Sequence, residues 1–267
     1  MWLSHGASLD MHGLKDFAYN TSALPLTCAL LDKGASLIHA GAISVDGQGV
    51  LMPAWGGVGK SLLVSQSVLH GRAKFLADDH AVIDRQGDLH LHLLPIHIYK
   101  YHTSDAVLAQ RLLGSLGAGD RLNWRVGCRL RPRRAVRWVA PQTLYTEARL
   151  ERTARLNQVV LMFRGDHSDF VWEEVDPESG ARCCAGVLFD EIRQMAERLA
   201  LGAAGWERGP LPQLHDAYAG VIDVLTGAFG HAAVHRTLIP RGAAAGDVVA
   251  FVRKSCPLID QAFDEAP

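Results

Sequence analysis

The sequence predicts an α/β domain built around a mixed β-sheet, with a helical part toward its C-terminus. Three observations support this fold class. Apolar runs of strand length lead the chain, a glycine-rich turn joins one of them to an amphipathic helix near residue 60, and the longest helical patterns follow residue 181. We expect a single domain with an N-terminal extension (1–33), a core (34–180) and a mostly helical C-terminal part (181–267).

Length and composition fit one globular domain with elaborations or two small domains. The chain has 267 residues, of which 48% are hydrophobic and 21% are charged, so it can bury a substantial core. Its formal net charge of −1 argues against nucleic acid or membrane surfaces as partners. No run of eighteen apolar residues and no signal-peptide pattern occurs, and the five cysteines form no C-x-x-C pair. We expect reduced thiols and a cytoplasmic location, and self-association into a homo-oligomer stays open.

The first half of the chain alternates between strand and helix signals. The extension is expected to hold an edge strand and a connecting turn. Two strands, 36–45 and 50–54, flank the hairpin turn Asp-Gly-Gln-Gly. The residues 60–71 have helical spacing and end at a glycine, and 73–79 is a strand that closes on two acids. Short strands around a turn follow up to residue 100.

Helical patterns become more frequent in the second half. A helix is expected at 103–116, followed by an arginine-rich stretch at 121–137. A buried strand at 157–165 is expected to pair with the strand at 170–175. The remaining expected elements are helices at 187–202, 211–230 and 245–255 and a late strand at 232–242.

The turn Pro-Ala-Trp-Gly-Gly-Val-Gly-Lys-Ser (53–61) nearly matches the phosphate-binding pattern G-x-x-x-x-G-K-[ST]. Glycines let backbone N–H groups curl around an anion, and the following helix adds its positive end. Lys60 would reach the β- and γ-phosphates of ATP, and the Ser61 hydroxyl would bind Mg²⁺. A chance turn before a helix is the alternative. The residues expected to bind the nucleotide are Trp55, Gly56, Gly57, Val58, Gly59, Lys60, Ser61 and Leu62.

Asp78 and Asp79 close the apolar strand that follows this helix. A strand adjacent to the loop strand would place both carboxylates beside the phosphates. Asp78 would then remove a proton from an attacking hydroxyl, and Asp79 would hold Mg²⁺. The alternative is a pair of ordinary turn acids.

Residues 38–83 resemble the catalytic domain of HPr kinase/phosphorylase. A histidine opens a strand there, and a turn, a second strand, the loop, a helix ending in glycine and an apolar strand ending in Asp-Asp follow, over about 46 residues. The resemblance implies ATP-dependent phosphoryl transfer in a P-loop fold related to phosphoenolpyruvate carboxykinase. It implies that His39, Lys60 and Asp78 are catalytic and that Ser61 binds magnesium. Without the resemblance, His39 would be read as a core histidine.

Two departures from this family are visible. Ala54 replaces the first loop glycine, which is costly only where φ must be positive. The stretch 91–103 contains no Asp or Glu, although the family places a further metal-binding acid in that region. Because the N-terminal extension is short, we expect this chain to lack the family's sensor domain and to be a relative that acts on another substrate. The missing acid leaves two alternatives, a metal held by fewer protein groups or a branch of the family that has lost activity.

Seven arginines lie between Arg121 and Arg137, flanked by Trp124 and Trp138. Arginine binds carboxylates and phosphates with two parallel hydrogen bonds, so this stretch would steady ATP or receive an acidic acceptor. A solvated surface is the alternative. The four histidines between residues 90 and 102 match no zinc spacing.

Three functions remain in play. The leading hypothesis is a kinase that transfers the γ-phosphoryl group of ATP to a hydroxyl of a peptide serine or a small molecule. Ala54 and the missing acid favour a catalytically inactive nucleotide-binding regulator or scaffold. The third hypothesis is an NTP hydrolase that uses water as the acceptor.

Overall fold

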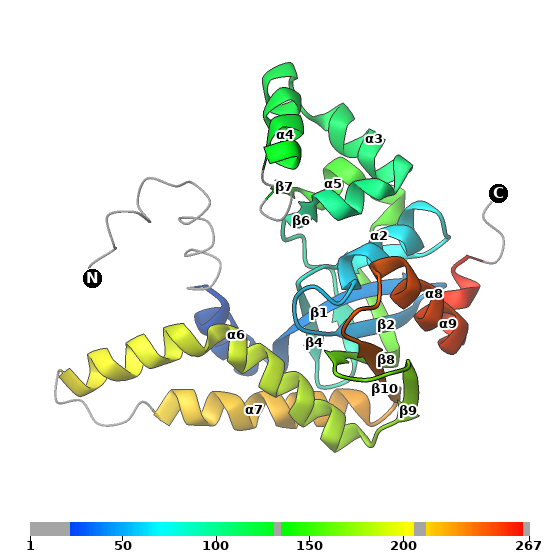
Figure 1. Cartoon of the computed structure of the whole chain (residues 1–267). Helices are drawn as coiled ribbons and strands as arrows, with labels where there is room; N and C mark the ends of the chain where they lie inside the picture. The colour runs from blue at the N-terminus through cyan, green and yellow to red at the C-terminus, as the bar shows by residue number, and fades with distance from the viewer. Residues whose placement is uncertain (1–21, 131–134, 206–211, 264–267) are drawn as a thin grey trace.

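The structure, a computed structural model, describes residues 22–130, 135–205 and 212–263 (Figure 1). Within these residues, eight strands form one sheet with helices on both faces, so the predicted α/β class with a mixed sheet is confirmed. The sheet is mostly antiparallel, and β8 pairs in parallel with both β2 and β10. Its order is β2-β1-β4-β5-β8-β10-β9, with β3 against β1. The strands are β1 (Ala35–Val45), β2 (Gln48–Pro53), β3 (Lys74–Ala77), β4 (His80–Asp84), β5 (Asp88–His90), β8 (Thr153–Gly165), β9 (Val171–Glu174) and β10 (Ala233–Pro240).

The strand β2 has neighbours on both sides. It forms a hairpin with β1, and its residues Gln48 to Leu51 pair in parallel with β8. Because β8 also pairs with β5, the strands β2, β1, β4, β5 and β8 form a closed circuit of pairings. The strand that leads into the glycine-rich loop is therefore held along both edges.

Two hydrophobic cores cover the two faces of the sheet. Side chains of β1 alternate between them, since Ile43 and Val45 join one core while Ala40 and Ala42 join the other. The first core contains α2 (Lys60–Leu69), α8 (Ala245–Ser255) and α9 (Pro257–Gln261). The second contains the helix at 22–31, α6 (Pro177–Gly205) and α7 (Pro212–Phe229).

A smaller group of elements stands beyond α2, at the top of Figure 1. Its two-stranded sheet pairs β6 with β7, and buried residues such as Leu112 and Trp124 join it to the first core. The elements are β6 (Ile96–Tyr99), η1 (Lys100–Ser104), α3 (Ala106–Ser115), α4 (Ala118–Leu130), β7 (Val136–Val139) and α5 (Pro141–Leu144). The short helix η2 (Glu147–Arg149) that follows them packs against β3.

Two sequence expectations are wrong. Residues 22–31 form a helix instead of an edge strand and a turn, because Ala23, Leu24 and Thr27 share one buried face. Residues 1–21 lie outside the described part of the chain. The strand β9 pairs with β10 and not with β8, because β10 already pairs with β8 from Gln158 to Gly165. None of the described helices has the length and apolar character needed to span a membrane.

Candidate functional site

The loop after β2 presents backbone N–H groups at the start of α2. Gly57 and Gly59 have φ values of 79° and 104°, in the left-handed region that glycine adopts at no steric cost. Gly59 is the N-cap of α2, no side chain caps this end, and the first turn holds no acid. The first N–H groups of a helix have no partner within the helix, and the helix dipole adds positive potential there. This end of α2 is therefore suited to an anion.

Ala54 does not distort the loop. It is buried and lies in a parallel bridge with Met162 of β8. Within the described part of the chain, the non-glycine residues with positive φ are Asp46 and Asp79, so Ala54 keeps an ordinary backbone conformation. The substitution of the first loop glycine therefore carries no conformational cost in this fold.

Lys60 is the first residue of α2, and its side chain is only 4% exposed. A Cβ atom built on Gly41 of β1 would lie 3.0 Å from Lys60 Cγ, so the lysine stem crosses the sheet where β1 has no side chain. The Lys60 ammonium reaches His39, which lies two residues before Gly41 and so on the same face of β1, with a distance of 2.6 Å from Nζ to Nε2. Lys60 Nζ also lies 3.7 Å from Asp79 Oδ1.

Glu191 of α6 completes a chain of polar contacts that begins at Lys60. Its carboxylate contacts His39 Nδ1 and lies 3.3 Å from His80 Nε2. An ammonium group only donates hydrogen bonds, so His39 Nε2 accepts from Lys60 and the proton of the neutral ring sits on Nδ1, where it is donated to Glu191. Burial and the Lys60 charge lower the pKa of His39, although Glu191 acts in the opposite direction, and this favours the neutral ring.

His39, His80 and Glu191 also have the composition of a metal site, since their ligand atoms lie within 4.8 Å of one another. A cation on His39 Nδ1 would move the ring proton to Nε2, where it would face the Lys60 ammonium. Two donors would then oppose each other at 2.6 Å. The Lys60–His39 contact therefore favours a hydrogen-bond network over a metal centre at these three residues.

The two aspartates sit in a tight turn between β3 and β4. The His80 N–H donates to the Asp78 carbonyl at 2.9 Å, and the residue between them, Asp79, has a φ of 66°, as in a γ-turn. Successive side chains of a regular strand point to opposite faces. The turn breaks this alternation, and both aspartates come close enough to Lys60 to feel its charge.

The two carboxyl groups have opposite electrostatic environments. Asp78 is 1% exposed, and its pKa is raised to about 7 by burial and by the charge of Asp79. Lys60 and the nearby Ser61 hydroxyl counter this shift only in part. Burial would also raise the pKa of Asp79, but its hydrogen bond with His97 and the charge of Lys60 lower it overall. One acid is thus poised to exchange a proton near neutrality while its neighbour stays ionised.

The expectation that the strand ending in Asp78 and Asp79 lies next to the loop strand is wrong, although Asp79 still lies close to Lys60. β3 does not pair with the loop strand β2, because β1 lies between them. The loop strand and the acidic turn contact β1 from opposite sides at residues 39–40. The Ala54 N–H donates to the His39 carbonyl on one side, and the Ala40 N–H donates to the Asp79 carbonyl on the other. The loop and the acidic turn therefore leave β1 at the same level.

The remaining residues expected at the nucleotide site have mixed environments. Trp55 is 42% exposed, and its Nε1 donates to Asp190 of α6 at 3.3 Å. Val58 and Leu62 are buried in the first core, so they contribute packing and backbone, not side-chain contacts to a ligand. Gly56 has open space where a side chain would stand.

Three side chains at the site were not predicted, namely His80, His97 and Glu191. His97 of β6 lies 3.0 Å from Asp79 through Nδ1, and its ring packs on Trp138 of β7 with centroids 4.2 Å apart. Glu191 was detectable in principle. It falls three residues after buried Leu188 and seven after buried Cys184, so an acid occupies the buried face of an amphipathic helix.

No protein-family profile matches the chain, and no curated protein matches it. Among solved structures it is similar to the Hpr(Ser) kinase/phosphatase from Coxiella burnetii, with 12% sequence identity and a TM-score of 0.36, over 84% of this chain and 99% of that one.

Proposed function

We propose that this protein is an ATP-dependent phosphotransferase that moves the γ-phosphoryl group to a hydroxyl of an acceptor. One observation carries the proposal. A buried lysine at the start of a helix lies beside two aspartates, of which one has its pKa lowered and stays ionised, while the other is buried, forms no ion pair among the described residues and has its pKa raised to about 7. A general base works best when its pKa lies near the operating pH.

The phosphate groups of ATP fit the loop. The uncapped start of α2 and the left-handed glycines Gly57 and Gly59 offer backbone N–H groups without side chains in the way. Lys60 supplies the positive charge that a triphosphate requires. Trp55 lies at the exposed side of the loop, where its ring is accessible to a nucleotide base.

Magnesium also fits the oxygen donors present. Ser61 and Asp79 would hold it, since Mg²⁺ prefers hydroxyl and carboxylate oxygens together with phosphate and water. Asp79 Oδ1 remains 3.7 Å from Lys60, longer than a hydrogen bond, and the lowered pKa keeps this carboxylate ionised. When bound, the ion would neutralise negative charge on the phosphate oxygens.

In the proposed reaction, the acceptor oxygen forms a bond to the γ-phosphorus while the bond from that phosphorus to the β–γ bridging oxygen breaks. The hydroxyl proton passes to Asp78, and ADP leaves. Lys60 neutralises the phosphate charge, and the His39–Glu191 pair holds Lys60 in place.

The test uses γ-labelled ATP, magnesium and size-fractionated extract of the source cells as the supply of acceptors. The wild-type protein should give a labelled product, and Asp78→Asn should give none while its affinity for ATP, measured by calorimetry, stays within a few-fold. ATP binding with neither product nor ADP would support the regulator hypothesis. Phosphate release without an acceptor would support the hydrolase hypothesis.

A further inference from the structure

The segment from Lys100 to Thr146 is strongly cationic within a nearly neutral chain. It contains nine lysines and arginines but only two acids, Asp105 and Asp120, whereas the whole chain has a net charge of −1. Asp105 caps α3 and contacts His70, and Asp120 pairs with Arg137. Both carboxylates are therefore already engaged, and among the described lysines and arginines of this segment only Arg137 forms an ion pair with a carboxylate.

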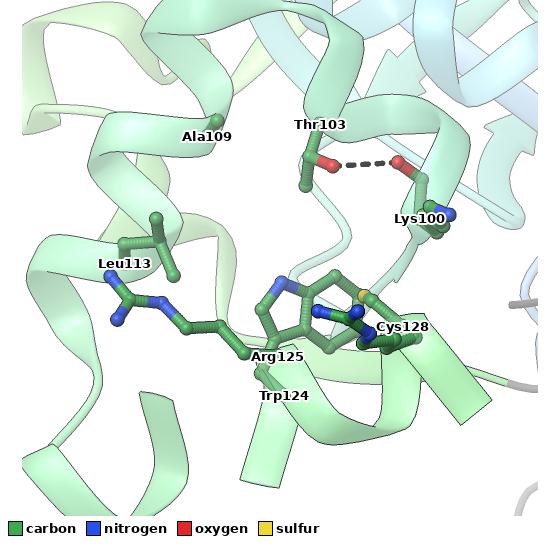
Figure 2. Close-up of a pocket in the computed structure, with 8 residues that line it drawn as sticks. Lys100, Thr103, Ala109, Leu113, Trp124, Arg125 and Cys128 are labelled. Carbon is green, nitrogen blue, oxygen red and sulfur yellow. Dashed lines mark hydrogen bonds between the residues drawn. The ribbon is translucent and has the colours of Figure 1, made fainter. Parts of the chain in front are cut away.

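A hollow of about 530 Å³ opens between η1, α3 and α4 (Figure 2). Arg125 reaches from α4 toward Leu113 of α3, and Thr103 donates a hydrogen bond to the Lys100 carbonyl. Trp124, only 6% exposed, supplies an aromatic wall. Three cations line the hollow, namely Lys100, Arg125 and Arg129. None of them forms an ion pair with a carboxylate of the described residues.

The exposed face of α4 continues this surface. Leu122, Val126 and Leu130 follow one another at intervals of four residues and are 64%, 45% and 73% exposed. On a helix, this spacing forms one stripe, and it lies next to Arg125 and Arg129. A cationic hollow thus borders an apolar stripe that no described residue covers.

The hollow starts close to the proposed reaction centre. Lys100 directly follows β6, whose His97 contacts Asp79. The pKa of Tyr101, the next residue, is raised to about 12 by burial and by the charges of Tyr99, Asp78 and Asp79. None of the loop residues 55–62 lines the hollow, so its cations are not arranged around the proposed triphosphate site.

We propose that the hollow and the α4 stripe together bind a peptide segment that carries carboxylates next to apolar residues, and that this segment belongs to the phosphoryl acceptor. The assignment of this segment to the phosphoryl acceptor rests on the proposed function, whereas the binding of the peptide does not depend on it. Arginine forks bind carboxylates bidentately, while the stripe and Trp124 receive apolar side chains. A stripe that spans nine residues of α4 is longer than a small acid requires, which favours a peptide.

The test measures peptide binding without ATP. The probes are two serine-containing peptides of equal length, one with alternating Glu and Leu and one with Gln in place of each Glu, together with N-acetylglutamate as a small acid. Tryptophan fluorescence reports binding, and Trp124→Phe identifies the part of the signal that comes from the hollow. The variants are Arg125→Gln and Arg129→Gln. Arg121→Gln is the matched control, because Arg121 lies on the same helix, loses the same charge and does not line the hollow.

The acidic peptide should bind the wild type and Arg121→Gln equally, and Arg125→Gln and Arg129→Gln should each weaken it at least tenfold, with unchanged affinity for ATP. Equal binding of both peptides, equal binding by all variants, or no binding of either peptide would overturn the proposal. N-acetylglutamate binding as tightly as the peptide would overturn the peptide assignment. Loss of ATP affinity in Arg125→Gln would instead assign these arginines to the nucleotide. If the acidic peptide binds but no acceptor is ever phosphorylated, the proposed function fails and the binding surface remains.

Discussion

The protein carries two groups of charges that are built in opposite ways. Around Lys60 the charges are buried or partly buried, and most lie within hydrogen-bonding or ion-pairing distance of one another, from Glu191 through His39 and Lys60 to Asp79 and His97. Around α4, the cations Lys100, Arg125 and Arg129 are exposed and have no acidic partner among the described residues. Buried charges that are already paired fix geometry, whereas exposed cations without a partner are available to an incoming anion. The first group is therefore suited to chemistry and the second to recognition.

The largest effect is expected for Asp78, the carboxylate of this group that forms no ion pair with any described residue. The pKa of Asp78 is raised to about 7. Between about pH 4 and about pH 7 this carboxyl is ionised in the unfolded chain but resists ionisation in the folded protein, so the free energy of unfolding falls as pH rises through this range. Asp78→Asn should therefore stabilise the protein at pH 8 by on the order of a few kcal/mol, because each unit of pKa shift corresponds to about 1.4 kcal/mol.

The neighbouring Asp79→Asn is the matched comparison, and it should destabilise the protein because Asp79 is paired with His97 and Lys60. Asparagine tolerates the left-handed backbone of residue 79, and residue 78 has no positive φ. Urea unfolding at pH 8 and at pH 4 measures both effects. Destabilisation by Asp78→Asn at pH 8 would contradict the assignment of Asp78 as a buried charge.

The pH dependence of phosphotransfer should show the same group at work. Below pH 7 the carboxylate form of Asp78 that the proposed reaction needs is lost, so kcat should fall about fiftyfold from pH 7 to pH 5 and approach tenfold per pH unit at the lower end. Initial rates at saturating ATP and acceptor measure this profile, with stability checked by circular dichroism at each pH. A flat profile between pH 5 and pH 7 would remove Asp78 from the role of base.

A smaller effect is expected for Glu191, which touches the site only through His39 and His80. Glu191→Leu should lower kcat about tenfold, since a hydrogen bond to a charged group contributes about 1.5–3 kcal/mol. Glu191→Gln keeps an acceptor oxygen for His39 Nδ1 and should restore most of the rate, a rescue that a purely packing role would not give. Glu178→Gln, a change of the same kind on the same helix at a residue that pairs only with Arg182, serves as the control.

The smallest expected effect is that of salt, which should act differently on the two groups of charges. Exposed charges are screened at about 0.15 M ionic strength, where the Debye length is about 8 Å, while buried pairs are screened much less. Raising NaCl from 50 to 300 mM should weaken binding of the acidic peptide several-fold and leave the unfolding free energy almost unchanged. Equal sensitivity of both quantities would show that the two groups do not differ as described.

Local sequence signals explain why the loop, α2 and the acidic turn were predictable. These elements lie within one stretch of about 46 residues, where alternation, glycines and terminal acids each mark a boundary. The contact of Lys60 with His39 was not predictable from spacing, because it depends on Gly41 leaving room for the lysine stem. Glu191 and His97 reach the site through tertiary packing of α6 and β6, which no local pattern specifies.

The arginine-rich stretch shows a different limit. Its charge density suggested a surface, yet most of it is the helix α4, with Trp124 buried beneath exposed arginines. The helical period of this stretch was hard to recognise among the polar residues. Its apolar stripe of Leu122, Val126 and Leu130 faces outward, whereas the apolar stripe of most helices faces the core.

The closed circuit of strands has a consequence for the order in which the protein matures during synthesis. The strand before the glycine-rich loop gains its second neighbour only when β8 has emerged from the ribosome, long after the loop itself has been translated. A nascent chain that ends before residue 153 would carry every residue of the loop but only one edge of its support. The proposed capacity to hold a nucleotide should therefore arrive late and abruptly, as a property of the nearly finished polypeptide.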